Sequence, residues 1–148
     1  MNKRELIAYR PAQLTDMAFI YRSILMGTFH GNRPAKGQKL DPKCPVDYFS
    51  SINQDTFMKE YHAYLDHLFS VPGNEIKIAC LVEEPDVILG FSVFRSGVLH
   101  FVFVKPDWRH IRIGSDLIPA DIKSVTGFTR VGDIIRRRKG WEFNPWAQ

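Results

Sequence analysis

The stretch of residues 99–117, LHFVFVKPDWRHIRIGSDL, constrains the fold of this chain more than any other. Its first six residues are apolar except for His100, a pattern typical of a strand that is buried on both faces. Pro106 cannot continue a β-ladder, so we expect the strand to end before it. A basic turn follows, and the residues from Ile113 onward predict a short helix. Such a helix start favours anion binding, because unpaired backbone N–H groups and the positive end of the helix dipole point to one place.

This stretch resembles the acyl-CoA-binding motif of the GNAT (Gcn5-related N-acetyltransferase) superfamily. The motif is an apolar strand that ends in Val-x-Pro, then Arg/Gln-x-x-Gly-x-Gly/Ala, and then a helix with Leu near its first turn. The residues of this chain that match it are Val104, Pro106, Arg109, Gly114 and Leu117. At the position of the first glycine the chain has Arg112 instead. The resemblance implies an α/β (α+β) GNAT-like fold, in which helices flank a mixed, mostly antiparallel sheet.

The elements predicted before the motif follow the GNAT order. Apolar patterns predict strands over residues 6–11, 76–82 and 88–94 and helices over residues 15–28 and 55–69. Thr15 or Asp16 is expected to cap the first helix, and Asp55 or Thr56 the second. The segment from Arg10 to Asp16 also resembles the R-x-A-x-x-x-D sequence that is common at the first helix of GNAT proteins.

The chain after the motif departs from the usual GNAT pattern. Pro119 lies a few residues into the third helix and should end it early, whereas GNAT proteins usually continue this helix for several turns. We then expect a strand over residues 123–128, a helix from Thr129 to Lys139 and a short strand over residues 141–146. This ending resembles GNAT-like proteins encoded in the genomes of tailed bacteriophages.

Residues 29–53 are the irregular part of what we expect to be a single domain over residues 1–148. Their glycines and prolines are Gly31, Pro34, Gly37, Pro42 and Pro45. They predict a long loop insertion between the first two helices, and loops of this length are often functional. In GNAT enzymes this segment helps to form the side where the acceptor binds, so the resemblance implies acceptor or partner contacts here. The alternative is a solvated loop without such a role.

The composition limits the class of protein. With 148 residues, 45% of them hydrophobic, the chain is long enough to bury a full core. No window holds the roughly 20 apolar residues of a membrane span, and the N-terminus lacks an apolar signal segment, so no membrane partner is expected. Cys44 and Cys80 are far apart, which indicates reduced thiols and a cytoplasmic location, in the host or in the virion if the protein is phage-encoded. The net charge of +4 is compatible with a polyanion such as coenzyme A.

The resemblance assigns an acetyl-CoA site to the motif. The backbone of Val102 and Val104 would pair with the pantetheine arm, and the pyrophosphate would lie on the amides between Arg109 and Ser115. The cofactor-binding residues are thus expected to be Val102, Val104, Arg109, Arg112, Ile113, Gly114 and Ser115. Arg112 leaves two alternatives open. Its Cβ could block the close approach that a glycine permits, or its guanidinium could itself bind phosphate.

The motif strand offers one candidate for a catalytic base. Many GNAT enzymes have a glutamate early on the motif strand, where this chain has Val98. His100 has a suitable pKa and is our candidate base, but a histidine on a buried strand is also common as a hydrogen-bonded core residue. The tyrosine acid that GNAT enzymes place after their fifth strand is missing, because no tyrosine follows Tyr64.

Two functions of different class remain. The first is an acetyl-CoA-dependent N-acyltransferase that acts on a small-molecule or protein amine. The second is a catalytically silent GNAT-like structural or binding protein, whose partners would be phage structural proteins. No metal site is expected, since the histidines and cysteines lack ligand spacing. Nucleic acid is not favoured as a partner, because the basic run from Arg136 to Lys139 also suits a helix C-terminus.

Overall fold

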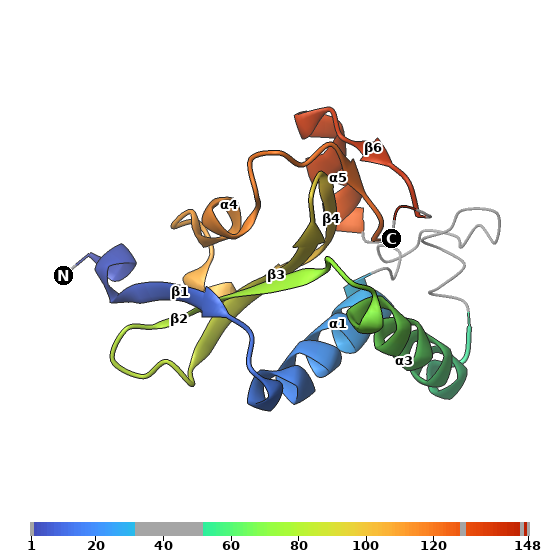
Figure 1. Cartoon of the computed structure of the whole chain (residues 1–148), viewed down its shortest axis with the longest axis horizontal. Helices are drawn as coiled ribbons and strands as arrows, with labels where there is room; N and C mark the ends of the chain where they lie inside the picture. The colour runs from blue at the N-terminus through green and yellow to red at the C-terminus, as the bar shows by residue number, and fades with distance from the viewer. Residues whose placement is uncertain (1, 32–51, 128–129, 146, 148) are drawn as a thin grey trace, which may run out of the picture.

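One six-stranded sheet organises the computed structural model, which describes residues 2–31, 52–127, 130–145 and 147 (Figure 1). Its strands lie side by side in chain order: β1 (Ile7–Pro11), β2 (Glu75–Leu81), β3 (Ile88–Arg95), β4 (Val98–Val104), β5 (Ser124–Val125) and β6 (Glu142–Phe143). The pairs β1–β2, β2–β3 and β3–β4 are antiparallel, whereas β4–β5 and β5–β6 are parallel. The sheet is therefore mixed and mostly antiparallel.

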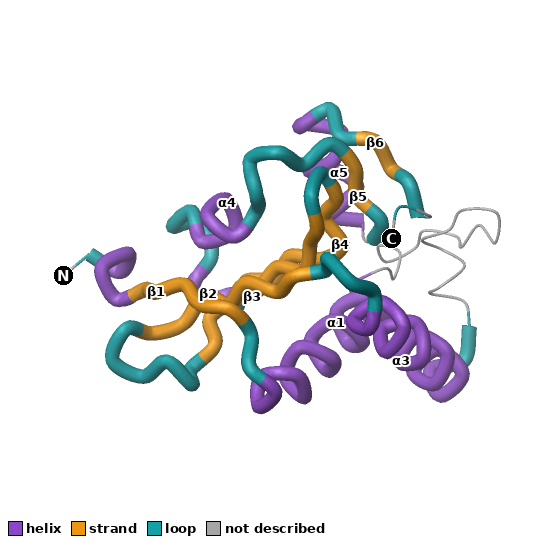
Figure 2. Tube along the Cα trace, viewed as in Figure 1, coloured by secondary structure: helices purple, strands orange, loops and turns teal. Residues whose placement is uncertain are grey.

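Helices cover both faces of this sheet. Figure 2 shows α1 (Met17–Gly31) and α3 (Gln54–Ser70) together on one side of the strands and the short α4 (Ile113–Leu117) on the other. Helix α5 (Arg130–Lys139) lies between β5 and β6 in the chain. Three 3-10 turns complete the described elements: η1 (Lys3–Leu6), η2 (Leu14–Asp16) and η3 (Pro106–Trp108).

The main core lies between the sheet and the pair α1–α3. Helical spacing in α3 places its apolar side chains on one face, and four of them are buried: Phe57, Tyr61, Leu65 and Leu68. They belong to the same apolar cluster as Ile20 and Ile24 of α1 and Phe91 of β3. Burial of a large apolar side chain contributes about 1.5–3 kcal/mol, so this face holds both helices on the sheet.

A smaller core lies under α4 on the opposite face. It consists of Ala79, Leu89, Ile113 and Leu117, all of them buried. Gly90 lies beside this core, and a Cβ at Gly90 would approach the carbonyl oxygen of Phe103 to 2.5 Å. Only glycine permits β3 and β4 to come this close there.

The predicted α/β architecture with a shortened third helix is confirmed. Helix α4 ends at Leu117, and Ile118 has an extended backbone (φ −89°, ψ 120°). Pro119 explains this end, because a proline disfavours helical geometry in the residue before it and has no N–H of its own to donate. Gly140 follows α5 with φ +72°, as the prediction of a helix C-terminus at Lys139 requires.

Several predicted boundaries were wrong. Asn53, not Asp55 or Thr56, caps α3, because the Asn53 side chain accepts hydrogen bonds from the amides of both. Before α1 the chain forms η2, whose N-cap is Gln13. Helix α1 continues to Gly31, so Phe29 is a buried helical residue and not the start of the loop.

The elements after α4 are shorter than predicted. The strands expected over residues 123–128 and 141–146 contain only two residues each, in β5 and β6. Helix α5 begins at Arg130, and Thr129 lies outside the described residues. So do residues 32–51, which carry most of the predicted loop insertion. None of the helices in the described part of the chain has the length and apolarity of a membrane span.

Candidate functional site

Strand β4 pairs with its two neighbours over different lengths. It pairs with β3 from Val98 to Val104 but with β5 only at Val98 and Leu99, which face Ser124 and Val125. One further hydrogen bond, from the Thr126 amide to the Leu99 carbonyl oxygen (3.2 Å), closes this contact. Beyond it, no described strand pairs with this edge of β4. We call the point where β4 and β5 separate the fork, and the rest of that edge the open edge of β4.

The open edge presents the backbone of two residues for which the resemblance implied cofactor binding. The Lys105 amide donates to the Leu89 carbonyl oxygen of β3 (2.8 Å). Backbone groups alternate in direction along a strand, so Phe103 also faces β3, whereas Val102 and Val104 face the open edge. Arg109 supports this orientation, because its Nε donates to the Val104 carbonyl oxygen at 2.9 Å.

The turn between β4 and α4 contains two residues in a left-handed conformation, His110 (φ +66°) and Arg112 (φ +73°). Both are exposed residues with a Cβ, and the left-handed region costs such residues about 1–2 kcal/mol. The Arg112 carbonyl oxygen still accepts the first helical bond of α4, from the Asp116 amide at 3.0 Å. A backbone with φ near +73° favours glycine, so the chain forms this turn with Arg112 at a cost in strain.

Side chains from the sheet hold α4 in place. Lys77 Nζ donates to the Asp116 carbonyl oxygen (2.9 Å), and Ser92 Oγ donates to the Leu117 carbonyl oxygen (2.7 Å). The Asp116 carboxylate accepts hydrogen bonds from Arg4 (3.1 Å) and Tyr9 (2.9 Å). Burial and this carboxylate raise the pKa of Tyr9 well above its usual value. Lys77 and Ser92 thus supply donors for carbonyl oxygens at the end of α4, which find no partner within a helix of one turn.

Positive charge surrounds the turn. Lys3 donates to the Asp107 carbonyl oxygen (2.7 Å) and lies over the Trp108 ring, and Lys105 lies over the Phe19 ring. Arg109 and Arg112 are exposed in the same turn. A phosphate-bearing ligand that approaches the turn would meet this charge.

His100, the candidate base, is buried (2% exposed) and has partners at both ring nitrogens. Nδ1 lies 2.7 Å from Thr126 Oγ1, and Nε2 lies 3.1 Å from Asn74 Oδ1. Asn74 uses its amide nitrogen to donate to the Leu68 carbonyl oxygen (2.8 Å), so its oxygen must accept from Nε2–H, and Nδ1 accepts from the Thr126 hydroxyl. Burial, with a contribution from Arg95, lowers the pKa of His100 to about 4. The ring is therefore neutral at pH 7.

A cavity of about 740 Å³ opens where β1 and β3 end and β2 begins. Phe69, Phe94 and Asn74 are among its lining residues, so the cavity reaches one of the partners of His100. Its volume is in the range of small-molecule sites. Glu75, an exposed carboxylate, also lines it.

The structure brings together only part of the predicted site. Val104 and Arg109 are hydrogen-bonded, and a Cβ on Gly114 would lie 3.9 Å from Val104 Cγ2. Ile113 is a buried core residue, and Ser115 is exposed. Sequence analysis did not identify the residues that hold α4 and the ring of His100: Lys77, Ser92, Asp116, Asn74 and Thr126. No local signal marks them, because each contact joins segments far apart in the chain.

Among the described residues, no group of three or more histidine, cysteine, aspartate or glutamate side chains is arranged to hold a metal ion. Cys80 is a buried free cysteine, and its Sγ lies 3.6 Å from the Ala8 carbonyl oxygen.

No protein-family model matches the sequence, and no curated protein matches it. Solved structures do resemble it. A GCN5-related N-acetyltransferase structure from Rhodopseudomonas palustris has a TM-score of 0.47 and 16% identity, over 91% of this chain and 68% of that one. A putative acetyl transferase from Pyrococcus furiosus has a TM-score of 0.48 and 11% identity, over 93% and 78%.

The aminoglycoside N-acetyltransferase AAC(6')-Iy, solved in complex with CoA, has a TM-score of 0.46 and 16% identity, over 92% of this chain and 88% of that one. At these identities the likeness concerns the fold alone. The α/β architecture that the sequence predicts, a mixed and mostly antiparallel sheet flanked by helices with a short helix after the motif turn, is the one that the chain has.

Proposed function

We propose that this protein binds acetyl-CoA along the open edge of β4 and transfers the acetyl group to an amine. In such a transfer the amine nitrogen attacks the thioester carbonyl carbon, the C–S bond breaks, and the proton from the amine passes to the thiolate. The observation that carries the proposal is the fork. Parallel strands that separate after Leu99 leave the backbone of Val102 and Val104 without a strand partner among the described residues, next to a basic turn.

The chemistry of this edge suits the ligand. Pantetheine contains two amide groups, which can pair with backbone N–H and C=O groups as another strand would. The phosphates would lie against the turn of Arg109 and Arg112, where charge-assisted hydrogen bonds are available. For this the Arg109 side chain would exchange its bond to the Val104 carbonyl oxygen for a phosphate.

The 740 Å³ cavity is our candidate for the acceptor side. Asp16 neutralises Arg10 there, and Lys77 donates to the Asp116 carbonyl oxygen, whereas Glu75 is exposed. A carboxylate beside the aromatic rings of Phe69 and Phe94 favours a cationic amine over an anionic acceptor.

Calorimetric titration with acetyl-CoA, CoA and pantetheine tests the donor site. We expect micromolar binding of the first two and much weaker binding of pantetheine, which lacks the nucleotide phosphates. Arg109→Ala should weaken acetyl-CoA binding by about tenfold or more, since a hydrogen bond to a charged group contributes about 1.5–3 kcal/mol. Arg138→Ala is the matched control, because it removes one exposed positive charge from α5 and leaves the turn intact. Absence of binding at millimolar acetyl-CoA would contradict the proposal.

A second candidate function is a binding or structural role without catalysis, such as that of a phage particle component. One observation favours it: both ring nitrogens of the candidate base His100 are already hydrogen-bonded to other side chains, so neither is free to take a proton from an amine. A screen of amines with acetyl-CoA, in which released CoA thiol is measured, separates the two. Acetyl-CoA binding without thiol release from any amine class would favour the second function.

A further inference from the structure

A network of hydrogen bonds, one of them buried and two partly buried, lies at the fork. His100 and Thr126 are each 2% exposed, and the bond between them measures 2.7 Å. The hydrogen-bond network continues from His100 to Asn74 and from Asn74 to the Leu68 carbonyl oxygen. The network thus joins β4, the segment after β5, the residue before β2 and helix α3.

This hydrogen-bond network lies at the point where β4 and β5 separate. The register of β3 and β4 shifts between Val93 and Phe94, which face Phe101 and Leu99, so His100 is an extra residue in β4. Such a bulge bends a strand and disturbs its ladder. On the other side, Thr126 directly follows the last paired residue of β5, Val125.

Gly127 adds a close approach at the same place. A Cβ at this residue would lie 2.9 Å from the His100 carbonyl oxygen, so the segment after β5 passes directly beside the bulge. The residues on either side of the fork are therefore fixed by a bulge, a side-chain hydrogen bond and a glycine contact.

We propose that His100 and Thr126 are positioning residues that set where β4 and β5 separate. A strand edge with unpaired N–H and C=O groups tends to add a further strand. If β5 moved along the open edge of β4, the buried Nδ1 of His100 would lose the Thr126 hydroxyl and remain unpaired. Burial makes that loss costly, so the hydrogen bond holds the fork at Leu99 and keeps Val102 and Val104 available.

The consequence for ligand binding rests on the proposed function, whereas the effect on the fork does not. Thr126→Val removes the hydroxyl and keeps the shape of the side chain, and Thr126→Ser keeps the hydroxyl as the matched control. Hydrogen exchange of backbone amides reports on the fork directly, because the Thr126 amide donates to the Leu99 carbonyl oxygen. Calorimetry with acetyl-CoA, well below the unfolding temperature, reports on the open edge.

For Thr126→Val we expect exchange of the Thr126 amide to accelerate at least tenfold, while amides of β2 and β3 such as Ile78 and Phe91 keep their rates. Acetyl-CoA affinity should fall at least tenfold. Thr126→Ser should match the natural protein within about twofold in both measurements. A uniform acceleration of all these amides would indicate global destabilisation and overturn the proposal, as would unchanged exchange at Thr126.

The two proposals fail in different ways. If the natural protein does not bind acetyl-CoA, the proposed function is wrong, and the exchange rates alone decide whether His100 and Thr126 set the fork. If it binds acetyl-CoA and Thr126→Val binds equally well, the positioning role is wrong and the proposed function stands.

Discussion

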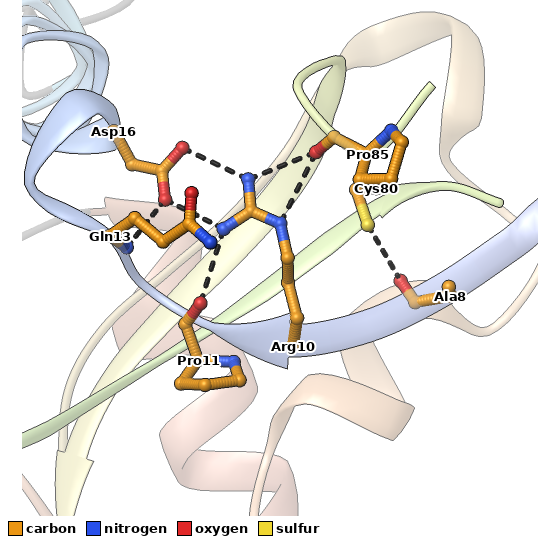
Figure 3. Close-up of polar contacts among 7 residues, drawn as sticks. All are labelled: Ala8, Arg10, Pro11, Gln13, Asp16, Cys80 and Pro85. Carbon is orange, nitrogen blue, oxygen red and sulfur yellow. Dashed lines mark hydrogen bonds and ion pairs between the residues drawn. The ribbon is translucent and has the colours of Figure 1, made fainter. Parts of the chain in front are cut away.

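Arg10 and Asp16 form a largely buried ion pair with two hydrogen bonds, from Nη1 to Oδ2 at 2.7 Å and from Nη2 to Oδ1 at 3.0 Å (Figure 3). The same guanidinium donates to the carbonyl oxygens of Pro11 and Pro85, so one side chain joins β1, η2 and the turn between β2 and β3. The hydrogen bond from Arg10 lowers the pKa of Asp16. This pair gives the R-x-A-x-x-x-D sequence a structural role.

Asp16→Asn should destabilise the protein by about 3–5 kcal/mol, because it leaves the Arg10 guanidinium buried without its counter-charge. Urea unfolding followed by circular dichroism measures the change. Asp66→Asn is the matched control, since Asp66 pairs with His62 on the surface, where such pairs contribute less than about 1 kcal/mol, and the asparagine oxygen can still accept the hydrogen bond from the Tyr21 hydroxyl. Equal losses for the two variants would contradict a special role for the Arg10–Asp16 pair.

Gly90→Ala should lower the free energy of unfolding by about 1–3 kcal/mol, the usual range for overpacking. The reason is that the new Cβ would approach the Phe103 carbonyl oxygen of β4 to 2.5 Å. Thermal unfolding checks this outcome. In contrast, Gly27→Ala in α1 meets no atom within 4 Å and should raise stability by about 0.5–1 kcal/mol through helix propensity. A neutral Gly90→Ala would show that β3 and β4 can separate at this point without cost.

Arg112→Gly should be more stable than Arg112→Ala by up to about 1 kcal/mol. Both variants remove the guanidinium, but only glycine adopts φ +73° without strain, and its greater freedom in the unfolded chain offsets part of the gain. Chemical denaturation of the two variants in parallel gives the difference. The same two variants test the open alternatives for Arg112. If the guanidinium binds phosphate, both variants should lose affinity for acetyl-CoA. If the Cβ obstructs the ligand, only Arg112→Gly should gain affinity.

The buried ring of His100 should make the free energy of unfolding depend on pH. Its pKa is about 4 in the folded state against 6.5 for an ordinary histidine, so between these values the unfolded chain binds a proton that the folded chain does not. Stability is therefore full above about pH 6.5 and falls by up to about 3 kcal/mol as the pH drops toward 4. Unfolding free energies measured from pH 7 to pH 4 for the natural protein and His100→Gln test this. The variant should show a shallower slope, and identical slopes would contradict the burial of a neutral ring.

Features encoded by neighbouring residues were predictable. The apolar run before Pro106 predicted β4, the spacing of Phe57, Tyr61 and Leu65 predicted α3, and Pro119 predicted the short α4. Each depends on periodicity or on the geometry of a proline, which act over a few residues. The resemblance of the motif to GNAT proteins then identified Val102 and Val104 as residues of interest, and the alternation along β4 turns both toward the open edge.

Features that depend on other parts of the chain were not predictable in this way. Three polar residues near the start of α3 could each have capped it, and only the backbone conformation at Asn53 selects one. Strand β5 has only two residues because its pairing with β4 ends at Val125, and the composition of residues 123–128 does not indicate this end.

By itself the sequence determined the order of the elements, the apolar faces that bury them and the turn after β4, since local sterics and periodicity decide these. The tertiary structure alone decided the state of His100. Its partners Asn74 and Thr126 are each 26 residues away, in opposite directions along the chain, and no local pattern links them. Burial removes water from the ring, and these two side chains replace it, so packing decides that the one polar residue of the central strand is neutral and paired.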